Sequence, residues 1–365
     1  MLAQVEDLKQ NLRSRLHEPR RWFGSLRRVS MARAIQGSNS IEGFKATLDD
    51  AAAVEVGEQP LDADEETRLA LEGYRNAMTY VLQVAAEMDF SYSVQLLKSL
   101  HFMMTAYDLK NRPGRWRSGA IYVSKESSGE VVYEGPDVEE VPVLMDQLVR
   151  QLNAKDDTPT MVRAAMAHLN LVMVHPFRDG NGRMARCLQT LVLAREGVLA
   201  PVFSSVEEYL GADTQAYYDV LEVVGAGQWQ PDRDALPWVR FILTAHLRQA
   251  RTVLRRVKET ERLWDELEKI AERHSLPERV ISALHDAAIG FRVRRATYRA
   301  VDKDEITEQT ASRDLHHLVE VGLLVPQGEK RGRFYLAGAE LKAIRKAIVD
   351  ARDPRDNSDP FAAGA

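Results

Sequence analysis

Apolar residues recur at helical spacing along most of the chain, and the alternation typical of strands is confined to two short regions. Helical stretches are predicted at residues 1–35, 65–88, 92–107, 138–152, 160–174 and 183–195. Proline and glycine interrupt this pattern, with Pro19 breaking the first stretch and Asn-Arg-Pro-Gly at 111–114 following the third. Gly197 ends the last of them. The pattern therefore predicts a mainly α protein.

The first strand-like region is a predicted β-hairpin. Residues 119–124 and 131–133 are two short β-prone runs, with Ser127, Ser128 and Gly129 in the turn between them. An ordinary surface ribbon would give the same pattern, so the pattern alone assigns the hairpin no function.

After residue 247 the chain becomes a long, highly charged helix to about residue 270, which we interpret as a connector. A small separate unit follows, in which Thr307 caps a predicted helix that Gly322 ends. The last residues are rich in Asp, Pro, Asn and Gly, which predicts disorder. The predicted division is an N-terminal helical region, a core, a connector, a small C-terminal unit and a disordered tail, at residues 1–60, 61–246, 247–274, 275–347 and 348–365.

The chain of 365 residues is long enough for two or three domains, and its 45% hydrophobic residues suffice for a buried core. A net charge of −5 argues against binding to nucleic acid or membranes through overall charge. Cys187 is the single cysteine, which excludes an internal disulfide and fits a reducing compartment. No apolar run approaches the ~20 residues that span a bilayer, and the N-terminus lacks a secretory signal. A cytoplasmic protein without a membrane partner is therefore expected.

The stretch from His175 to Arg186 reads His-Pro-Phe-Arg-Asp-Gly-Asn-Gly-Arg-Met-Ala-Arg and has the features of an anion site. A helix ends before it, and a loop with Gly180 and Gly182 leads into the next helix. Glycines let an anion approach the backbone N–H groups closely, and the helix N-terminus adds unpaired donors and a favourable dipole. Arg183 lies three residues before Arg186, so both project from one face, where they could neutralise a polyphosphate.

Two further side chains add chemistry to this site. Asp179 is a hard oxygen ligand suited to a Mg²⁺ ion that also contacts phosphate oxygens. His175 can accept a proton from a hydroxyl group near neutral pH. Taken singly, the features have simpler explanations: a helix-end histidine is usually a cap, Gly-Asn-Gly a turn, and an arginine pair a solvated face. Their conjunction favours a site.

The same stretch resembles the signature of the Fic family, His-x-Phe-x-Asp/Glu-Gly-Asn-Gly-Arg-x-x-Arg. From average amino-acid usage, its chance occurrence in a chain of this length is on the order of 10⁻⁸. The resemblance extends over roughly residues 30 to 245 and implies a Fic-type helical bundle core with a short β-hairpin flap. It also implies a transferase that moves AMP from ATP to a hydroxyl side chain of a target protein.

Roles for single residues follow from this resemblance. His175 is implied to deprotonate a Ser, Thr or Tyr hydroxyl, and Asp179 to hold Mg²⁺ on the α- and β-phosphates of ATP. Arg186 is implied to bind the γ-phosphate, and Phe177 to anchor the loop in the core. The implied anion hole consists of Gly180, Asn181, Gly182 and Arg183. Positioning and electrostatics would then supply most of the catalysis.

The segment Pro-Gly-Arg-Trp-Arg-Ser-Gly at 113–119 and the hairpin after it resemble the family's flap. In the family, the flap pairs with the segment of the target that is modified, which is recognition by strand addition. The implied docking residues are Gly119, Ala120, Ile121, Tyr122 and Val123. The implied partner is a protein substrate, with the chain itself among the candidates.

Ser-Asn-Ser-Ile-Glu-Gly at 38–43 resembles the family's inhibitory helix, predicted here at about residues 36–43. Ser38 and Glu42 are four residues apart and share a helical face, and Gly43 is a natural end point. The resemblance implies that Glu42 pairs with Arg186 and blocks the γ-phosphate seat. Plain helix capping would explain the same residues. In some relatives this glutamate activates water to remove AMP, so the reverse activity stays an alternative.

Residues 213–221 resemble a family segment near the nucleoside. Asp213 stands where the family usually has Asn, and an ionised carboxylate cannot donate a hydrogen bond. Asp213 and Tyr217 are therefore candidate nucleotide contacts with the base selectivity left open. Tyr217 and Tyr218 fit a core position equally well.

The C-terminal unit resembles a winged helix-turn-helix, a module often appended to Fic domains. Arg313 and the basic turn residues Lys330, Arg331 and Arg333 could contact phosphates. Residues 275–350 hold 13 Lys and Arg against 11 Asp and Glu, a net of +2, which is low for a DNA-binding module. A docking or structural role is therefore favoured over DNA.

These observations predict an autoinhibited protein adenylyltransferase. The alternatives are AMP removal, transfer of another phosphate-linked group on the same scaffold, and a nucleotide-sensing winged-helix regulator. The filled catalytic positions argue against the last. Because inhibition in this family is often tied to self-association, a homo-oligomer is a further expectation.

Overall fold

Helices make up most of the protein, as the spacing of apolar residues predicts, and the strands form two small sheets. The computed structural model describes residues 2–16, 20–124, 128–195, 197, 205–301, 306–329, 332–354, 356 and 358–361. Pro19, Ser127, Lys330 and Arg331, which the sequence analysis singled out, lie outside these described residues.

Up to residue 225 the described α-helices are α1 (Leu2–Leu16), α2 (Phe23–Ile41), α3 (Leu48–Glu55), α4 (Glu65–Val84), α5 (Val94–Thr105), α6 (Val141–Asn153), α7 (Thr160–Val174), α8 (Asn181–Arg195), α10 (Glu207–Ala212) and α11 (Thr214–Gly225). The later ones are α12 (Leu236–Arg273), α13 (Ile281–Ile289), α14 (Arg295–Val301), α15 (Glu308–Glu320) and α16 (Ala339–Asp350). Short 3₁₀ helices are η1 (Leu109–Asn111) and η2 (Glu278–Val280). The strands are β1 (Tyr122–Ser124), β2 (Val131–Glu134), β3 (Gly227–Gln228), β4 (Leu324–Gln327) and β5 (Phe334–Ala337).

Side-chain caps explain where several of these helices begin. Thr47 and Asp50 form a reciprocal capping box at the start of α3, and Asp64 accepts the Thr67 N–H at the start of α4. Ser93 does the same for α5. Because these short polar residues satisfy N–H groups that the helix leaves unpaired, the helix starts are defined locally.

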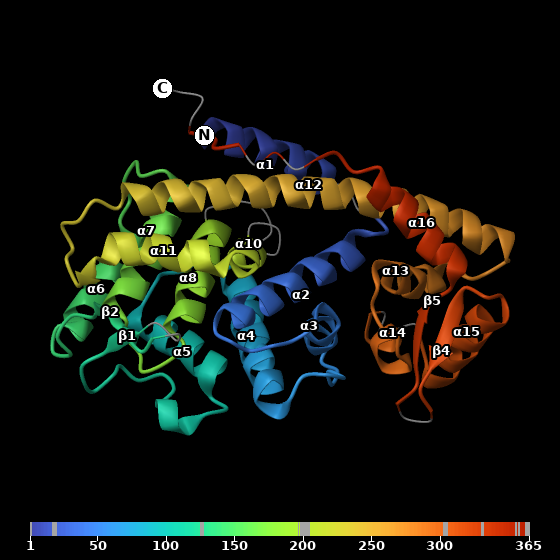
Figure 1. Cartoon of the computed structure of the whole chain (residues 1–365), viewed down its shortest axis with the longest axis horizontal. Coiled ribbons are helices and arrows are strands. Elements are labelled where there is room, and N and C mark those ends of the chain that lie inside the picture. The colour runs from blue at the N-terminus through green and yellow to red at the C-terminus, as the bar shows by residue number, and fades with distance from the viewer. Residues whose placement is uncertain are drawn as a thin grey trace.

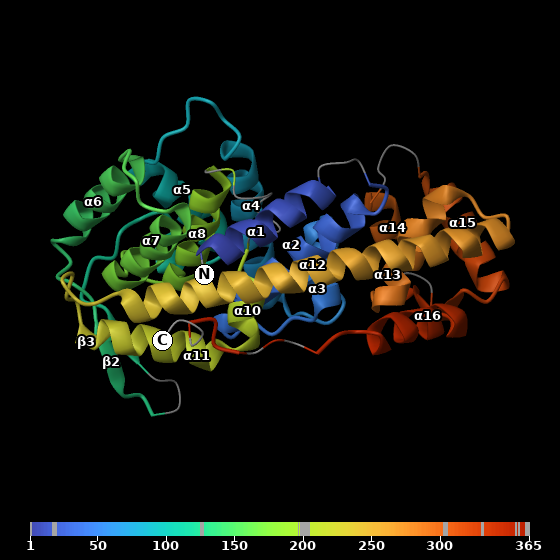
Figure 2. The same cartoon turned by 90° about the horizontal axis from the view of Figure 1, so that it is seen from above.

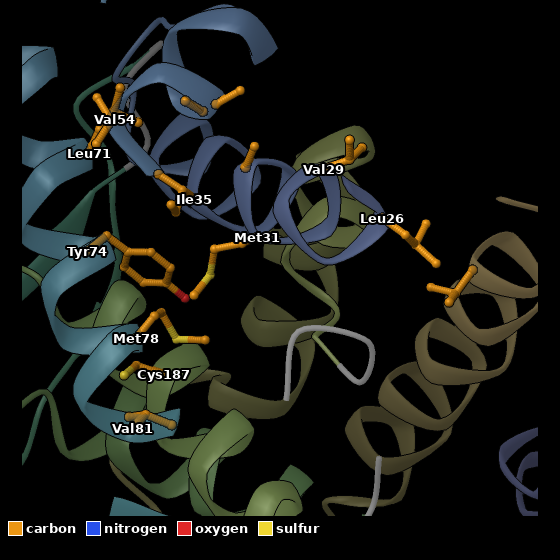
Figure 3. Close-up of a cluster of buried hydrophobic side chains, with 14 of the residues drawn as sticks. Leu26, Val29, Met31, Ile35, Val54, Leu71, Tyr74, Met78, Val81 and Cys187 are labelled. Carbon is orange, nitrogen blue, oxygen red and sulfur yellow. The ribbon is translucent and has the colours of Figure 1, made fainter. Parts of the chain in front are cut away.

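The core is built where α2, α4 and α8 pack together, and α3 joins them (Figure 3). Ile35 of α2, Tyr74 of α4 and Cys187 of α8 are each fully buried there. Burial raises the pKa of the Cys187 thiol, which is therefore held in its neutral form. The Tyr74 hydroxyl donates a hydrogen bond of 2.8 Å to Glu207 of α10, so the apolar cluster contains a satisfied polar contact.

The predicted hairpin is present, and it gains a strand that the sequence pattern did not predict. β1 pairs antiparallel with β2, with a register irregularity between Val123 and Ser124. β3 then adds parallel to β2 through Tyr133 and Gly227, so the order is β1-β2-β3. β1 is therefore left at an edge of this sheet.

α12 runs the length of the molecule and joins its two parts (Figures 1 and 2). The predicted connector helix began at residue 247, whereas α12 begins at Leu236 and crosses that position without a break. The reason is packing: Trp238 and Ile242, on the first turns, are fully buried against the α7 region. α1 lies along α12 in both views. Among the described helices, none combines the length and apolar character needed to cross a bilayer.

The C-terminal unit contains η2, α13, α14, α15, the antiparallel pair β4–β5, and α16. Thr307 caps α15 by accepting the Thr310 N–H, and Gly322, at φ +76°, follows its end. An isolated bridge between Val293 and Tyr335 extends the small sheet. This unit lies beneath the far end of α12, beside α2 and α3 (Figure 1).

Ion pairs join the C-terminal unit to the helices α2 and α3. Arg28 of α2 and Asp286 of α13 form a buried pair, with 6% and 5% of each residue exposed. Arg292 binds Asp49 of α3 at 2.7 Å and Asp62 at 2.8 Å. These contacts fasten the C-terminal unit to the segment 23–62 of the chain.

The expected disordered tail from residue 348 contains ordered structure at its start. α16 continues to Asp350, and Arg352 makes a two-pronged hydrogen bond to Glu259 of α12 at 2.7 Å for each prong. Further on, the centroid of the Phe361 ring lies 5.2 Å from the guanidinium carbon of Arg240. Composition indicated disorder because it carries no information on such contacts with a helix that is distant in sequence.

A buried polar network lies between α7, α8, α11 and α12. His168 is hydrogen-bonded through Nδ1 to Gln189 Oε1 at 2.6 Å and through Nε2 to the Tyr217 hydroxyl at 3.0 Å. Gln189 Nε2 in turn lies 2.9 Å from His246 Nε2. Because the Gln189 amide donates to His246 and its oxygen accepts from His168, His168 carries its proton on Nδ1 and accepts from Tyr217. Burial lowers the pKa of His168 to about 3, which keeps the ring neutral.

We predict that replacing Arg28 with Ala lowers the free energy of unfolding by about 3–5 kcal/mol, because Asp286 would be left buried without a counter-charge. Chemical denaturation of the two proteins measures the change. Arg150→Ala is the matched control, because Arg150 pairs with Asp146 on the surface and its loss should cost about 1 kcal/mol or less. Equal effects of the two substitutions would contradict the prediction.

We predict that lowering the pH from 7 to 5 removes about 2 kcal/mol of stability through His168 alone. In the unfolded chain the pKa of this ring is about 6.5, whereas in the folded chain it is about 3. The folded chain therefore stays unprotonated at His168 over this pH range. Stability is therefore complete above pH 6.5 and is lost as the pH falls below it. Urea unfolding of wild type and His168→Gln at both pH values measures the difference, which should shrink in the variant. His316→Gln, on the exposed face of α15, should leave the loss unchanged.

Candidate active site

The stretch singled out in the sequence forms a tight loop between α7 and α8. His175 ends α7 in the left-handed conformation, at φ +48°, and Asn181 begins α8. The Asn181 side chain closes the loop, accepting the Phe177 N–H at 2.9 Å and donating to the Phe177 carbonyl at 3.0 Å. The Phe177 ring is fully buried, as expected of an anchor. The Asn181 amide is thus engaged in shaping the loop.

The His175 ring has a defined tautomer. Its Nδ1 lies 3.0 Å from the Val172 carbonyl, which can only accept, so Nδ1 carries the proton. Nε2 then bears the lone pair. Burial lowers the pKa of His175 below its ordinary value, although the hydrogen bond to the Val172 carbonyl and the charge of Glu42 oppose this effect. The ring is therefore neutral at pH 7 and able to accept a proton.

Arg117, which the sequence analysis did not single out, holds the main chain at His175. Its Nε donates to the His175 carbonyl at 3.0 Å, and Nη1 donates to the Gly119 carbonyl at 2.7 Å. Nη2 donates to the Pro136 carbonyl, beyond β2. One buried guanidinium therefore joins the end of α7 to both sides of the hairpin. Its position within the segment 113–119 is the only signal in the sequence.

Asp179 lies on the outer part of the loop, with 46% of its side chain exposed. Its Oδ2 is 3.3 Å from the Asn111 amide and 3.5 Å from an Arg183 nitrogen. No cluster of three or more metal-ligating side chains occurs among the described residues. A single carboxylate nevertheless suits Mg²⁺, which is commonly held by one or two carboxylates together with substrate phosphates and water.

The two motif arginines are buried beside the N-terminus of α8. Arg183 is 1% exposed; it donates to the Tyr107 hydroxyl at 3.2 Å and lies over the Phe44 ring at 5.2 Å. The Arg186 side chain is fully buried. Arg183 Nε and Arg186 Nη1 have no hydrogen-bond partner among the described residues. These two donors leave room for a further acceptor, such as an anion.

Arg186 is held by the last turn of α2. Its Nε donates to Ser38 Oγ at 2.9 Å, and its Nη2 donates to the Ser38 carbonyl at 2.9 Å and to Glu42 Oε1 at 2.6 Å. The structure thus brings together the two residues whose pairing the resemblance implied. Burial alone would raise the pKa of Glu42, but Arg186 and Arg183 outweigh it and lower the pKa below its ordinary value.

The Glu42 carboxylate lies directly over the glycine loop. A methyl group placed on Gly182 would fall 2.4 Å from Glu42 Oε1 and 3.1 Å from Arg186 Nη1. Gly182 is the second residue of α8, a helix of 15 residues. The carboxylate therefore occupies the position at a helix N-terminus that favours an anion.

The end of α2 is fixed by several independent contacts. Gly43 adopts φ +84° and ends the helix, as its sequence position predicted. The Tyr218 hydroxyl of α11 donates to the Ile41 carbonyl at 3.0 Å. At Gly37 and Gly211 the backbones of α2 and α10 meet so closely that a side chain on either would collide. The carboxylate of Glu42 is thus delivered by a rigid element.

The predicted nucleoside contacts have other partners in this structure. Asp213 is exposed and caps α11 by accepting the Ala216 N–H at 3.2 Å. Tyr217 is 1% exposed and is bound to His168 in the buried network. A contact of either side chain with a nucleotide stays a prediction.

The predicted flap residues lie at the entrance to the hairpin and along β1. Gly119 and Ala120 are exposed and precede the strand, and the Ile121 carbonyl accepts the Gly135 N–H at 3.2 Å. Tyr122 and Val123 belong to β1, and Tyr122 is 54% exposed. Only the last two of the five therefore present strand backbone at the free edge of the sheet.

The part of the chain that holds this loop matches a known family. The profile of the Fic/DOC family matches residues 91–193. The chain is similar to the Protein adenylyltransferase Fic of Nematostella vectensis, at 28% identity over 266 residues, which covers 66% of this chain and 55% of the relative. It is also similar to the Protein adenylyltransferase fic-1 of Caenorhabditis elegans, at 36% identity over 135 residues, covering 35% and 22%. The chain thus spans about half or less of the length of these curated relatives.

Solved structures show the same fold. The crystal structure of a Fic family protein from Desulfovibrio desulfuricans G20 has a TM-score of 0.55 at 22% identity and covers 92% of this chain and 94% of its own. A Fic domain containing signaling protein from Bacteroides thetaiotaomicron VPI-5482 has a TM-score of 0.56 at 21% identity, covering 70% and 97%. Residues 91–193, which include the signature loop between α7 and α8, therefore match the Fic/DOC family.

Proposed function

We propose that this protein is an adenylyltransferase that moves AMP from ATP to a hydroxyl group of a protein side chain. The observation that carries the proposal is the carboxylate of Glu42 seated over Gly182 and against Arg186, because it marks an anion seat beside a neutral histidine. The names of the relatives, protein adenylyltransferases at 27–36% identity, support the same reaction.

In the proposed reaction the target hydroxyl attacks the α-phosphorus of ATP. A new oxygen–phosphorus bond forms, the bond to the β-phosphate bridge breaks, and pyrophosphate leaves. His175 Nε2, which bears the lone pair, takes the proton of the hydroxyl. The N–H groups at the start of α8 and the Arg183 and Arg186 guanidiniums bind the phosphates, whose charge they neutralise.

Asp179 is the residue that would hold Mg²⁺ in this proposal. Its carboxylate is half exposed and stands on the same loop as the anion seat, which fits an ion shared between one side chain and the phosphates. When bound, Mg²⁺ would neutralise phosphate charge and orient the leaving group. Asn111 and Arg183, which lie near Oδ2, hold the carboxylate in place for this role.

Glu42 is proposed to inhibit the enzyme from within the chain. Its carboxylate and a γ-phosphate would compete for the Arg186 guanidinium, whose Nη2 now donates to Glu42, and both are anions at pH 7. A hydrogen bond between charged groups contributes ~1.5–3 kcal/mol, so withdrawal of Glu42 favours productive ATP binding by about ten- to a hundred-fold.

The free edge of β1 is the proposed docking strand for the protein substrate. β1 has an unpaired side because the sheet order is β1-β2-β3, and Arg117 ties the base of the hairpin to His175. A target segment added along β1 would place its side chain near the loop while reading mainly backbone. A second copy of the chain is among the substrates that this mode accepts, and self-association is part of the same proposal.

The C-terminal unit is proposed to be a winged helix-turn-helix module with a docking or structural role. Two of its cations are engaged internally, Arg279 with Asp314 at 2.7 Å and Arg295 with Glu308 at 2.9 Å. Arg313 and Arg333 are exposed, but two charges are a weak attraction for DNA. The fully buried free thiol of Cys187 fits the reducing environment of the cytoplasm, where we place the activity.

The prediction that tests this function compares wild type, Glu42→Gly and Glu42→Gly/His175→Ala with labelled ATP and Mg²⁺. Label on the protein itself, followed by intact mass, should be low in wild type and about ten- to a hundred-fold faster in Glu42→Gly, because the competing carboxylate is gone. It should vanish when His175 is also removed, because no base remains.

Glu87→Gly is the matched control, since Glu87 is exposed and remote from the loop, and it should behave like wild type. An adduct with the mass of AMP identifies the reaction, whereas an adduct with the mass of phosphate would identify a different transfer. Silence of Glu42→Gly with ATP and with other nucleoside triphosphates would contradict the proposed inhibition.

A further inference from the structure

His101 of α5 is buried between the glycine loop and the segment that leads to the flap. It has no exposed surface, and its ring stacks on the Phe177 ring with 3.7 Å between centroids and 1° between planes. Its Nε2 lies 2.9 Å from the Asp179 carbonyl, and its Nδ1 lies 2.9 Å from the Gly114 N–H. One ring therefore touches both functional segments.

The two contacts require one protonation state. The Gly114 N–H can only donate and the Asp179 carbonyl can only accept, so Nδ1 of His101 must be bare and Nε2 must carry the proton. A second proton on Nδ1 would face the Gly114 N–H, donor against donor. Burial lowers the pKa of His101 to about 4, which keeps the ring in the required neutral form.

A histidine that only fills the core does not need these partners. The Asp179 carbonyl belongs to the residue proposed to hold Mg²⁺, and Gly114 begins the segment 114–119, through which Arg117 connects to the hairpin. The same face of α5 also supports the next loop residue, since a methyl group on Gly180 would lie 3.0 Å from the side chain of Thr105. The loop therefore packs on α5, and His101 makes the hydrogen bond between this helix and the loop.

We propose that His101 is a positioning residue that sets the glycine loop through Nε2 and the base of the flap through Nδ1. This inference rests on the proposed function, in which the loop binds ATP and the flap receives the target. His101 takes no part in the chemistry. Its two nitrogens act on separate segments, so their effects are separable by substitution.

Replacing His101 with Gln or with Asn keeps one of its two hydrogen bonds and removes the other. In His101→Gln the amide nitrogen reaches the position of Nε2 and keeps the bond to Asp179, while the acceptor for Gly114 is lost. In His101→Asn the amide oxygen takes the position of Nδ1 and keeps the bond to Gly114, while the donor to Asp179 is lost. His101→Phe keeps the stacked ring and removes both bonds.

The experiment places these variants in the Glu42→Gly chain and measures two quantities. The first is the Kd for ATP with Mg²⁺, and the second is the rate of amide hydrogen exchange over residues 114–124. For Gln we expect an unchanged Kd and faster exchange in the flap segment. For Asn we expect a Kd raised by about three- to ten-fold, the worth of one hydrogen bond, with exchange unchanged. Phe should show both effects.

His285→Gln is the matched control, because His285 is equally buried but lies in α13, away from the loop and the flap. It should change neither quantity. If Gln and Asn shift Kd and exchange together, or leave both at the parent values, the inference is wrong. A parent chain that does not bind ATP would instead refute the proposed function. The amide exchange rates over residues 114–124 in His101→Gln and His101→Asn can be compared without ATP. That comparison would still decide the role of His101.

Discussion

Arg186 carries its charge at a position from which water is excluded, and the arrangement of the surrounding helices follows from that constraint. Burying an unpaired cation costs several kcal/mol, so its guanidinium must be met by acceptors. These come from the end of α2 and the residue that follows it: the hydroxyl and carbonyl of Ser38 and the carboxylate of Glu42. Gly37 and Gly211 allow α2 and α10 to touch backbone to backbone, which helps to fix the helix that carries these acceptors.

The same constraint limits how Glu42 can leave. Its side chain is 23% exposed, so a rotation about its own bonds can carry the carboxylate toward solvent while Ser38 stays on Arg186. Moving α2 instead would also break the buried pair of Arg28 and Asp286, which joins the helix to α13. Breaking such a pair costs about 3–5 kcal/mol. Side-chain rotation is therefore the less costly route for the proposed release of Glu42, because Ser38 stays on Arg186 until a phosphate takes the place of the carboxylate.

Much of the site could be predicted from the sequence because its residues are close together in the chain. The helix 160–174 and the loop that follows it depend on local spacing and on residues with strong positional preferences, as does the cap at Thr307 outside the site. The contact between Ser38, Glu42 and Arg186 was predicted only by resemblance, since the residues are separated by more than 140 positions.

What could not be predicted depends on contacts between distant segments. β3 has two residues and pairs only because the end of α11 returns beside β2. α12 starts eleven residues before the predicted connector because Trp238 and Ile242 are buried on the α7 region, not because of their local pattern. Arg117 and His101 gave no signal of their own, since their partners are main-chain groups that any sequence would provide.

Main-chain carbonyls also set the chemistry of the loop. The Val172 carbonyl places the proton of His175 on Nδ1, and the Asp179 carbonyl places the proton of His101 on Nε2. Burial keeps both rings neutral, and main-chain groups fix opposite tautomers without a charged hydrogen-bond partner for either ring. A carboxylate in place of the Val172 carbonyl would make His175 easier to protonate, and its Nε2 would lose the lone pair at a higher pH. The Val172 carbonyl orients the ring without a full negative charge beside it, which suits the role as base proposed for His175.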